Sequence, residues 1–132
     1  KAHFIRAVME GVCFGLRNNI ETVESLGIQI NEVRAVGGGL KSPVWLDILA
    51  KILRKPVHTV TTPDTGNLGN ILMAGKAIGL YPDYASAVQR MVAVDQVISC
   101  PDGSPVYEKQ YRTFLELYRQ LQPVYRQAAE PA

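Results

Sequence analysis

Apolar residues recur every three or four positions from residue 4 to residue 23, which is the spacing of an α-helix. One ridge consists of Phe4, Val8, Val12, Leu16, Ile20 and Val23, and a second ridge beside it consists of Ile5, Met9 and Cys13. The pattern predicts an amphipathic helix over 4–26 that Gly27 ends. Ala7, Gly11 and Gly15 repeat every four residues on this helix. This spacing favours close packing of another backbone, and the alternative is a surface left open for a ligand.

Two short runs rich in valine predict strands at 33–36 and 57–60. Between them, Ser42 suits the N-cap of a helix and Pro43 suits its first position. The helix itself carries Val44, Trp45, Ile48, Leu49 and Ile52, and Pro56 ends it. Because a helix connects the two strands, we expect them to be parallel neighbours.

The second half of the chain predicts three further helices. One covers about 68–78 and ends at Gly79, and a short one over 84–91 is capped by Asp83. The last helix aligns Tyr107, Tyr111, Phe114, Tyr118 and Leu121 on one face. We expect this aromatic face to lie in the core, and the alternative is a contact with another part of a larger protein. The predicted order has no strand after residue 60.

A sheet of two short strands is small, because open sheets usually have about four to six strands. The chain also starts without Met and enters a helical pattern almost at once. Both observations indicate a piece of a larger protein, whose other strands come from outside this chain.

The 132 residues are 47% hydrophobic and carry a net charge of +2. A core of ordinary size is therefore possible, and the charge is too small and too scattered to indicate a nucleic-acid partner. Cys13 and Cys100 lie far apart, which is typical of reduced thiols in a cytoplasmic protein. No apolar run reaches the roughly 20 residues that cross a bilayer, so no membrane partner is expected.

The stretch AVGGGLKSPVW, residues 35–45, joins a predicted strand to a helix through three glycines. Glycines let backbone amides approach a phosphate, and a helix N-terminus adds free donors and the positive end of its dipole. Neither G-x-x-x-x-G-K-[ST] nor G-x-G-x-x-G is matched in full. The residues by themselves leave phosphate binding and a plain tight turn both open.

Four blocks in order carry a resemblance to a known family. They are RAVMEGVCFGLR at 6–17, GGGLKSPVWLDILAKILRKPV at 37–57, GNLGNILMAGKAIG at 66–79 and YEKQYRTFLELYRQL at 107–121. Together they resemble the C-terminal part of an FGGY-type carbohydrate kinase, of the xylulose kinase-like kind, in the actin/Hsp70/sugar-kinase superfamily. The glycines followed by K-S-P-x-W are the most specific element.

The resemblance implies an α/β fold, namely a partial ribonuclease-H-like (actin-like ATPase) domain, helix-rich with a short parallel strand pair. Residues 1–132 would be a single fragment, the C-terminal part of the second, nucleotide-side domain. The implied ligand is ATP or ADP, with Mg²⁺ in the parent enzyme. The implied nucleotide contacts are Gly37, Gly38, Gly39, Lys41, Ser42 and Asn67. Asn67 and Asn70 stand where the family usually has small residues, so the adenine side departs from the pattern.

The parent protein would transfer a phosphoryl group from ATP to a sugar hydroxyl. The family's catalytic aspartate and sugar site lie upstream, so the resemblance implies that this chain alone is inactive and meets a sugar only through the N-terminal part. None of Asp47, Asp64, Asp83, Asp95 and Asp102 is assigned to catalysis, and His3 and His58 make no metal site with a carboxylate.

Two further expectations remain. Helices and a strand edge built to meet other parts of a protein would be exposed, so we expect a homo-oligomer, most simply a two-fold dimer. The alternative to the kinase interpretation is a free-standing α/β interaction module whose glycine loop is only structural.

Overall fold

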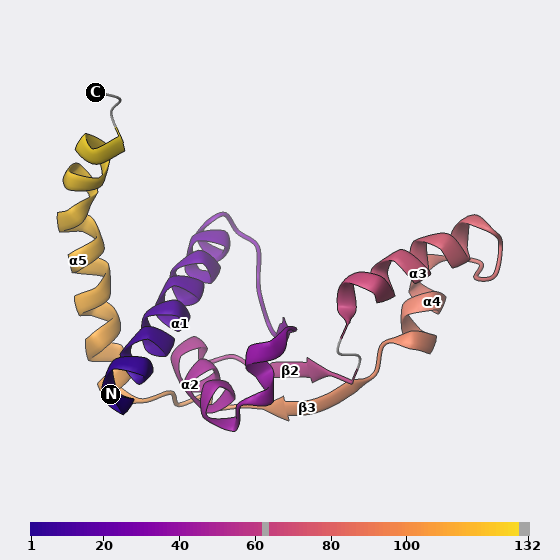
Figure 1. Cartoon of the computed structure of the whole chain (residues 1–132), viewed down its shortest axis with the longest axis horizontal. Coiled ribbons are helices and arrows are strands. Elements are labelled where there is room, and N and C mark those ends of the chain that lie inside the picture. The colour runs from indigo at the N-terminus through magenta and orange to yellow at the C-terminus, as the bar shows by residue number, and fades with distance from the viewer. Residues whose placement is uncertain (62–63, 130–132) are drawn as a thin grey trace.

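The structure, a computed structural model, describes residues 1–61 and 64–129. Five helices, three strands and one short 3₁₀ helix make up this part of the chain (Figure 1). In chain order these are α1 (Ala2–Ser25), β1 (Val33–Ala35), η1 (Gly38–Lys41), α2 (Pro43–Leu53), β2 (Val57–Val60), α3 (Thr65–Ala77), α4 (Tyr84–Met91), β3 (Val94–Ile98) and α5 (Pro105–Ala129).

The sheet has three strands in the order β1-β2-β3. β1 pairs with β2 in parallel, with Val33 opposite Val57, so the predicted parallel pair is confirmed. The expectation of only two strands was wrong, because β3 pairs antiparallel with the other edge of β2. Four of its five residues are exposed. Because neither face is buried, β3 has no alternation of apolar and polar residues that could have predicted it.

Helix α2 forms the centre of the fold, between the sheet and α1. Ser42 caps it by accepting a hydrogen bond from the Trp45 amide, and Pro43 occupies its first position, as predicted. Val57 and Thr59 of β2 are buried. The buried core consists of Cys13, Phe14, Leu46, Ile48, Leu49, Ala50, Ile52, Leu53, Val57, Tyr107 and Tyr111.

Helix α5 starts beside α1 and α2 and then diverges from them (Figure 1). Its first turns pack through Tyr107 and Tyr111, which are buried, and Phe114 packs against the same core. Tyr118 and Leu121 are 50% and 41% exposed, so only the first half of the predicted aromatic face lies in the core. The helix diverges from the core before the rest of that face can be covered.

The α1–α5 contact is polar at its rim. The Arg17 guanidinium makes two hydrogen bonds to the Glu108 carboxylate, of 2.6 and 3.1 Å, and lies 4.2 Å from the centre of the Tyr111 ring. The Tyr111 hydroxyl donates to Glu21 at 2.7 Å. These contacts fix the angle at which α5 leaves the core.

Helix α1 extends over Ala2–Ser25 and stops before Gly27, whose φ of +88° suits glycine. Of its two predicted apolar ridges, Cys13 and Met9 contact the core, whereas Phe4, Val8 and Val12 are exposed. The described residues place no heavy atom within 4 Å of where a Cβ on Gly11 or Gly15 would lie. The expected close packing of another backbone is therefore absent from the described part of this chain.

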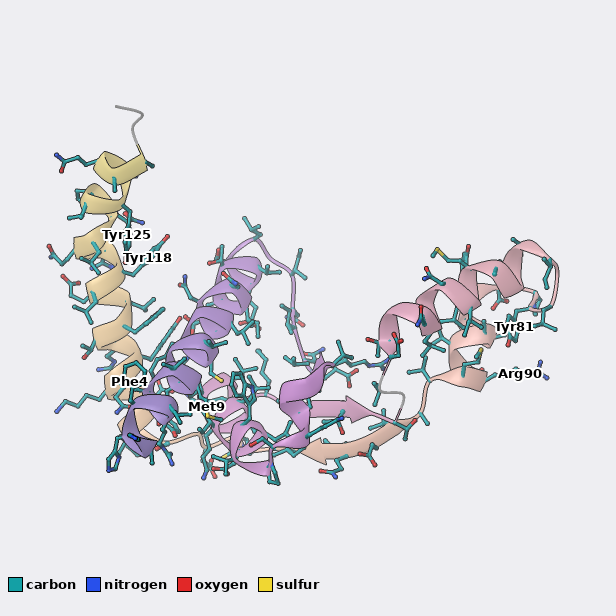
Figure 2. All side chains as sticks on the ribbon, in the orientation of Figure 1. Phe4, Met9, Tyr81, Arg90, Tyr118 and Tyr125 are labelled. Carbon is teal, nitrogen blue, oxygen red and sulfur yellow. The ribbon has the colours of Figure 1, made fainter. Side chains whose placement is uncertain are left out.

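Helices α3 and α4 form a hairpin that projects from the end of the sheet (Figure 1). Asp64 caps α3 by accepting from the Asn67 amide, and Asp83 caps α4 by accepting from the Ser86 amide at 2.7 Å. Tyr81 lies between the two helices and its hydroxyl contacts the Met91 sulfur (Figure 2). We refer to this hairpin as the arm.

Candidate functional site

The glycine loop connects the end of β1 to α2 through η1. Gly37 has φ +115°, a conformation that L side chains rarely adopt. The Leu40 amide then donates to the Gly37 carbonyl at 3.2 Å, and the Ser42 amide donates to Gly39 at 3.1 Å. The fold therefore requires glycine at position 37 to turn the chain away from the sheet.

Gly38 and Gly39 have no such requirement. Neither has positive φ, and no described heavy atom lies within 4 Å of where a Cβ on Gly38 would be. A Cβ on Gly39 would meet the Trp45 ring at 3.8 Å, an ordinary van der Waals contact. Their amides form no hydrogen bond to any residue that the structure describes. Both glycines thus have amides without a described partner, and the space beside Gly38 is open, which fits the close approach of an anion.

A hollow of about 440 Å³ with a mixed lining lies on one side of this loop, and we call it the polar hollow because it is the more polar of two hollows beside the loop. The Lys41 side of the loop forms one wall. The other wall consists of Thr59 of β2, Thr61 just after that strand, and Asp95 and Gln96 of β3. Asp95 and Gln96 were not predicted to line a site, because β3 was not predicted at all. Lys41 and Asp95 bring opposite charges to the same hollow.

An apolar hollow of about 750 Å³ lies on the other side of the loop. Its walls include Leu16 and Ile20 of α1, Trp45 and Leu49 of α2, and Gly39. Gly37 and Gly38 line both hollows. The glycine loop is therefore a thin wall between a polar and an apolar space, each in the size range of small-molecule sites.

Two predicted contact residues already have other partners. The Ser42 hydroxyl accepts from the Trp45 amide at 3.4 Å as the cap of α2. Asn67 lies in the first turn of α3, where its side chain donates to Asp64 at 2.6 Å. Neither residue lines the two hollows, whereas Gly37 and Gly38 line both, Gly39 lines the apolar one and Lys41 lines the polar one.

Three of the five aspartates have partners within their own helices. Asp47 is exposed and pairs with Lys51 at 2.7 Å on α2. Asp64 and Asp83 are helix caps. Asp95 alone among them reaches a hollow of the candidate site.

Within residues 1–61 and 64–129, no three His, Cys, Asp or Glu side chains are grouped so that they could hold a metal ion. The described side chains therefore offer no cage of three such ligands for Mg²⁺. Burial raises the pKa of the Cys13 thiol to about 11, so that thiol stays protonated near neutral pH. Over the same residues, no helix is both long enough and apolar enough to cross a bilayer.

Comparison with known proteins adds a family to this geometry. The C-terminal domain of the FGGY family of carbohydrate kinases matches residues 1–78. A xylulose kinase of Staphylococcus epidermidis is 28% identical over 121 residues, which are 91% of this chain and 24% of that protein. A probable L-xylulose kinase of Pasteurella multocida is 32% identical over 121 residues, which are 92% of this chain and 23% of that protein.

Solved structures match as well. The xylulose kinase from Rhodospirillum rubrum has a TM-score of 0.73 at 28% identity, over 94% of this chain and 25% of that one. The Plasmodium falciparum glycerol kinase with ADP has a TM-score of 0.69 at 20% identity, over 98% of this chain and 25% of that one. The expected α/β class, a partial actin-like ATPase domain, is confirmed by these matches. The chain spans about a quarter of the length of the relatives it matches.

Proposed function

The chain belongs to the FGGY family of carbohydrate kinases, and from that premise we propose that it is the C-terminal, nucleotide-side part of an ATP-dependent sugar kinase. In this proposal residues 1–132 form one fragment of the second domain and do not catalyse phosphoryl transfer alone. The observation that carries it is the open space above Gly38, beside amides free of partners in the described chain.

The residues present would bind the nucleotide rather than react with it. The Gly38 and Gly39 amides would donate to phosphate oxygens, and Lys41 would supply positive charge from the polar hollow. The apolar hollow beside Trp45 would take the base. Ser42 and Asn67 would act indirectly, by holding the first turns of α2 and α3.

The rest of the reaction lies outside these residues. ATP supplies the phosphoryl group, and transfer needs a positioned acceptor hydroxyl and neutralisation of phosphate charge. Asp47, Asp64, Asp83 and Asp102 line neither hollow, and Asp95 lines the polar hollow from β3. The sugar, a ketopentose of the xylulose kind, and Mg²⁺ would be bound by other parts of the parent kinase. The cytoplasm, where ATP is available and thiols stay reduced, is the proposed location.

Calorimetric titration of ATP into the chain tests the nucleotide site. We expect weak binding that Gly38→Val abolishes, because the valine side chain would fill the space beside the free amides. Gly11→Val is the matched control, since Gly11 also faces open space but lies on α1 and lines neither hollow. Equal binding by the Gly38 variant would contradict the proposed site, and robust sugar phosphorylation by the chain alone would contradict its inactivity.

Charge in the polar hollow gives a second test. Lys41→Ala is expected to weaken ATP binding, and Asp95→Asn is expected to strengthen it, each about two- to tenfold at low salt, because each changes one charge near the phosphates. Lys76→Ala, on the arm, is the control. Calorimetry at two salt concentrations measures the effect. An unchanged affinity in both hollow variants would place the phosphates elsewhere.

One observation favours the alternative, a free-standing α/β interaction module with a structural glycine loop. Large apolar side chains of α1 are exposed, which is typical of a docking surface. ATP binding that Gly38→Val abolishes would exclude this alternative, because a structural loop would bind no nucleotide.

The isolated chain is proposed to self-associate through its exposed helices, most simply as a two-fold dimer. Light scattering measures this directly. A monodisperse monomer at high concentration would contradict it.

A further inference from the structure

On helix α1 the charged side chains contact the rest of the chain and many large apolar side chains face solvent, which is the reverse of the usual arrangement on a surface helix. Every charged side chain on it forms a hydrogen bond or ion pair inside the chain: Arg6 and Glu10 with Tyr107, Arg17 with Glu108, Glu21 with Tyr111, and Glu24 with Lys55. The side that faces away from α2 and α5 carries large apolar residues instead. We define the outer face of α1 as Phe4, Ile5, Val8 and Val12, whose exposed fractions run from 47% to 74%.

The outer face lies opposite the residues that contact the core. Met9 projects from α1 toward α2, whereas Phe4 projects from a different side (Figure 2). Gly11 and Gly15 lie among the outer-face residues without a described atom near them, so another element could approach the helix backbone closely there. A helix with apolar residues on both sides is typical of the interior of a protein.

The accessible surface area of the whole chain is also larger than that of a compact protein of the same mass. Its accessible area is 9383 Å², whereas a compact monomer of this mass exposes about 6,900 Å². The excess of about 2,500 Å² is in the range of large, permanent interfaces. The chain by itself therefore leaves uncovered a surface area of the size of an interface.

We propose that the outer face of α1 docks against the other three quarters of an FGGY kinase, as a permanent contact within one protein. This inference rests on the proposed function. The lengths of the two proteins support the choice of partner. The solved xylulose kinase matches 94% of this chain with only 25% of its own chain, and the remaining three quarters belong to the same polypeptide.

A second copy of the chain fits the face less well. Exposed apolar side chains also gather on the arm and on the distal half of α5, which point away from α1 in separate directions (Figure 1). A two-fold contact through α1 would leave those surfaces open. A body three times the size of this chain can contact all three.

The test compares one substitution in two settings. The first is the chain itself. The second is a full-length chimera, in which the chain replaces the matching 121 residues of the Staphylococcus epidermidis xylulose kinase. At concentrations where light scattering gives the monomer, Val12→Asp should leave the melting temperature of the chain within about 1 °C, because Val12 is 47% exposed there. In the chimera it should lower the melting temperature by about 4 °C or more, because the carboxylate is then buried without a partner.

Val106→Asp is the matched control, since Val106 is 63% exposed at the first turn of α5, where a carboxylate is tolerated. It should be neutral in both settings, and Val8→Asp should behave as Val12→Asp does. The proposal is overturned if Val12→Asp and Val8→Asp are neutral in the chimera, if the chain unfolds there separately from the rest, or if the substitutions affect only self-association of the chain. Sugar phosphorylation by the chimera is a separate measurement. If the chimera unfolds in one transition and is destabilised by Val12→Asp but does not phosphorylate a sugar, the proposed function is contradicted and the docking proposal still holds.

Discussion

At the scale of single residues, the three loop glycines differ in what the fold demands of them. Gly37 is held at φ +115°, whereas Gly38 and Gly39 adopt conformations open to any residue. Of the three consecutive glycines, Gly37 is therefore required by the fold, whereas the fold does not explain why Gly38 and Gly39 are glycine. That difference is the main physical reason for assigning the loop to a ligand.

Gly37→Ala is expected to lower the free energy of unfolding by about 1–2 kcal/mol, because alanine at positive φ is strained. Gly38→Ala should leave it unchanged or raise it by up to about 1 kcal/mol, because the added methyl meets no atom and restricts the unfolded chain. Urea denaturation measures both. Equal destabilisation by the two variants would show that the loop is tight throughout.

Glu108 gives a prediction about pH. Hydrogen bonds from Arg17 hold the pKa of Glu108 below its ordinary value, against the effect of partial burial. Above the ordinary value, about 4.3, the carboxylate is charged in both states and its full stabilisation is present. As the pH falls below that value, the unfolded state binds the proton first. The stabilisation from Glu108 is therefore lost progressively as the pH falls towards the pKa of Glu108 in the folded state.

Glu108→Gln should therefore be less stable than the wild type at pH 7, with a shallower loss of stability below about pH 4.3. Lys55 and the Ser86 amide also lower the pKa values of Glu24 and Asp83, so part of the slope remains in both proteins. Thermal melts from pH 7 to pH 3 measure the slopes. Glu116→Gln, at an exposed pair on α5, should have little effect, and an unchanged slope in the Glu108 variant would refute the argument.

At the scale of elements, local chemistry determined most of what could be predicted. The caps at Ser42 and Asp83 and the stop at Gly27 act within one turn of chain, so sequence alone located α1, α2 and α4. β3 could not be predicted because its residues are exposed and only its backbone pairs with β2. Since Asp95 and Gln96 belong to β3, one wall of the candidate site was missed for the same reason.

The burial of helix faces was harder to predict than the helices themselves. Periodicity shows that a face is apolar, but it does not show whether the element that covers it belongs to the same chain. On α5, Tyr107 and Tyr111 are buried while Tyr118 is half exposed, although all three follow one pattern. On α1 the ridge that begins at Phe4 is exposed from Phe4 to Leu16 but packs against the core at Ile20.

The arm gives a prediction at this scale, because its two helices pack mainly on each other. A Cβ on Gly75 would lie 2.7 Å from the Tyr81 ring, so Gly75→Ala should force the hairpin apart. Gly69→Ala meets no atom and should stabilise α3 by up to about 1 kcal/mol. Amide hydrogen exchange should therefore become faster in the arm for the first variant and slower for the second, with α2 unchanged. Faster exchange in α2 would show that the arm and the core unfold as one unit.

At the scale of the whole molecule, the fold is a local core from which several elements project. α2 is surrounded by α1, the sheet and the start of α5, whereas the arm and the end of α5 lie away from it (Figure 1). Such a shape has a measurable thermodynamic consequence, because denaturant sensitivity scales with the surface that unfolding exposes. The unfolded chain exposes about 21,000 Å².

Unfolding this chain therefore exposes about 11,600 Å² in place of the about 14,100 Å² expected for a compact protein of the same mass. Its urea m-value should be about a fifth lower than that of a compact 132-residue domain. Urea titration should be made at concentrations where light scattering gives the monomer, because self-association would cover part of the surface. In the chimera with the xylulose kinase body, the same residues should unfold with the rest in one transition of larger m-value. An m-value typical of a compact domain for the monomer would mean that the chain closes on itself, and its apolar helix faces would then need no partner.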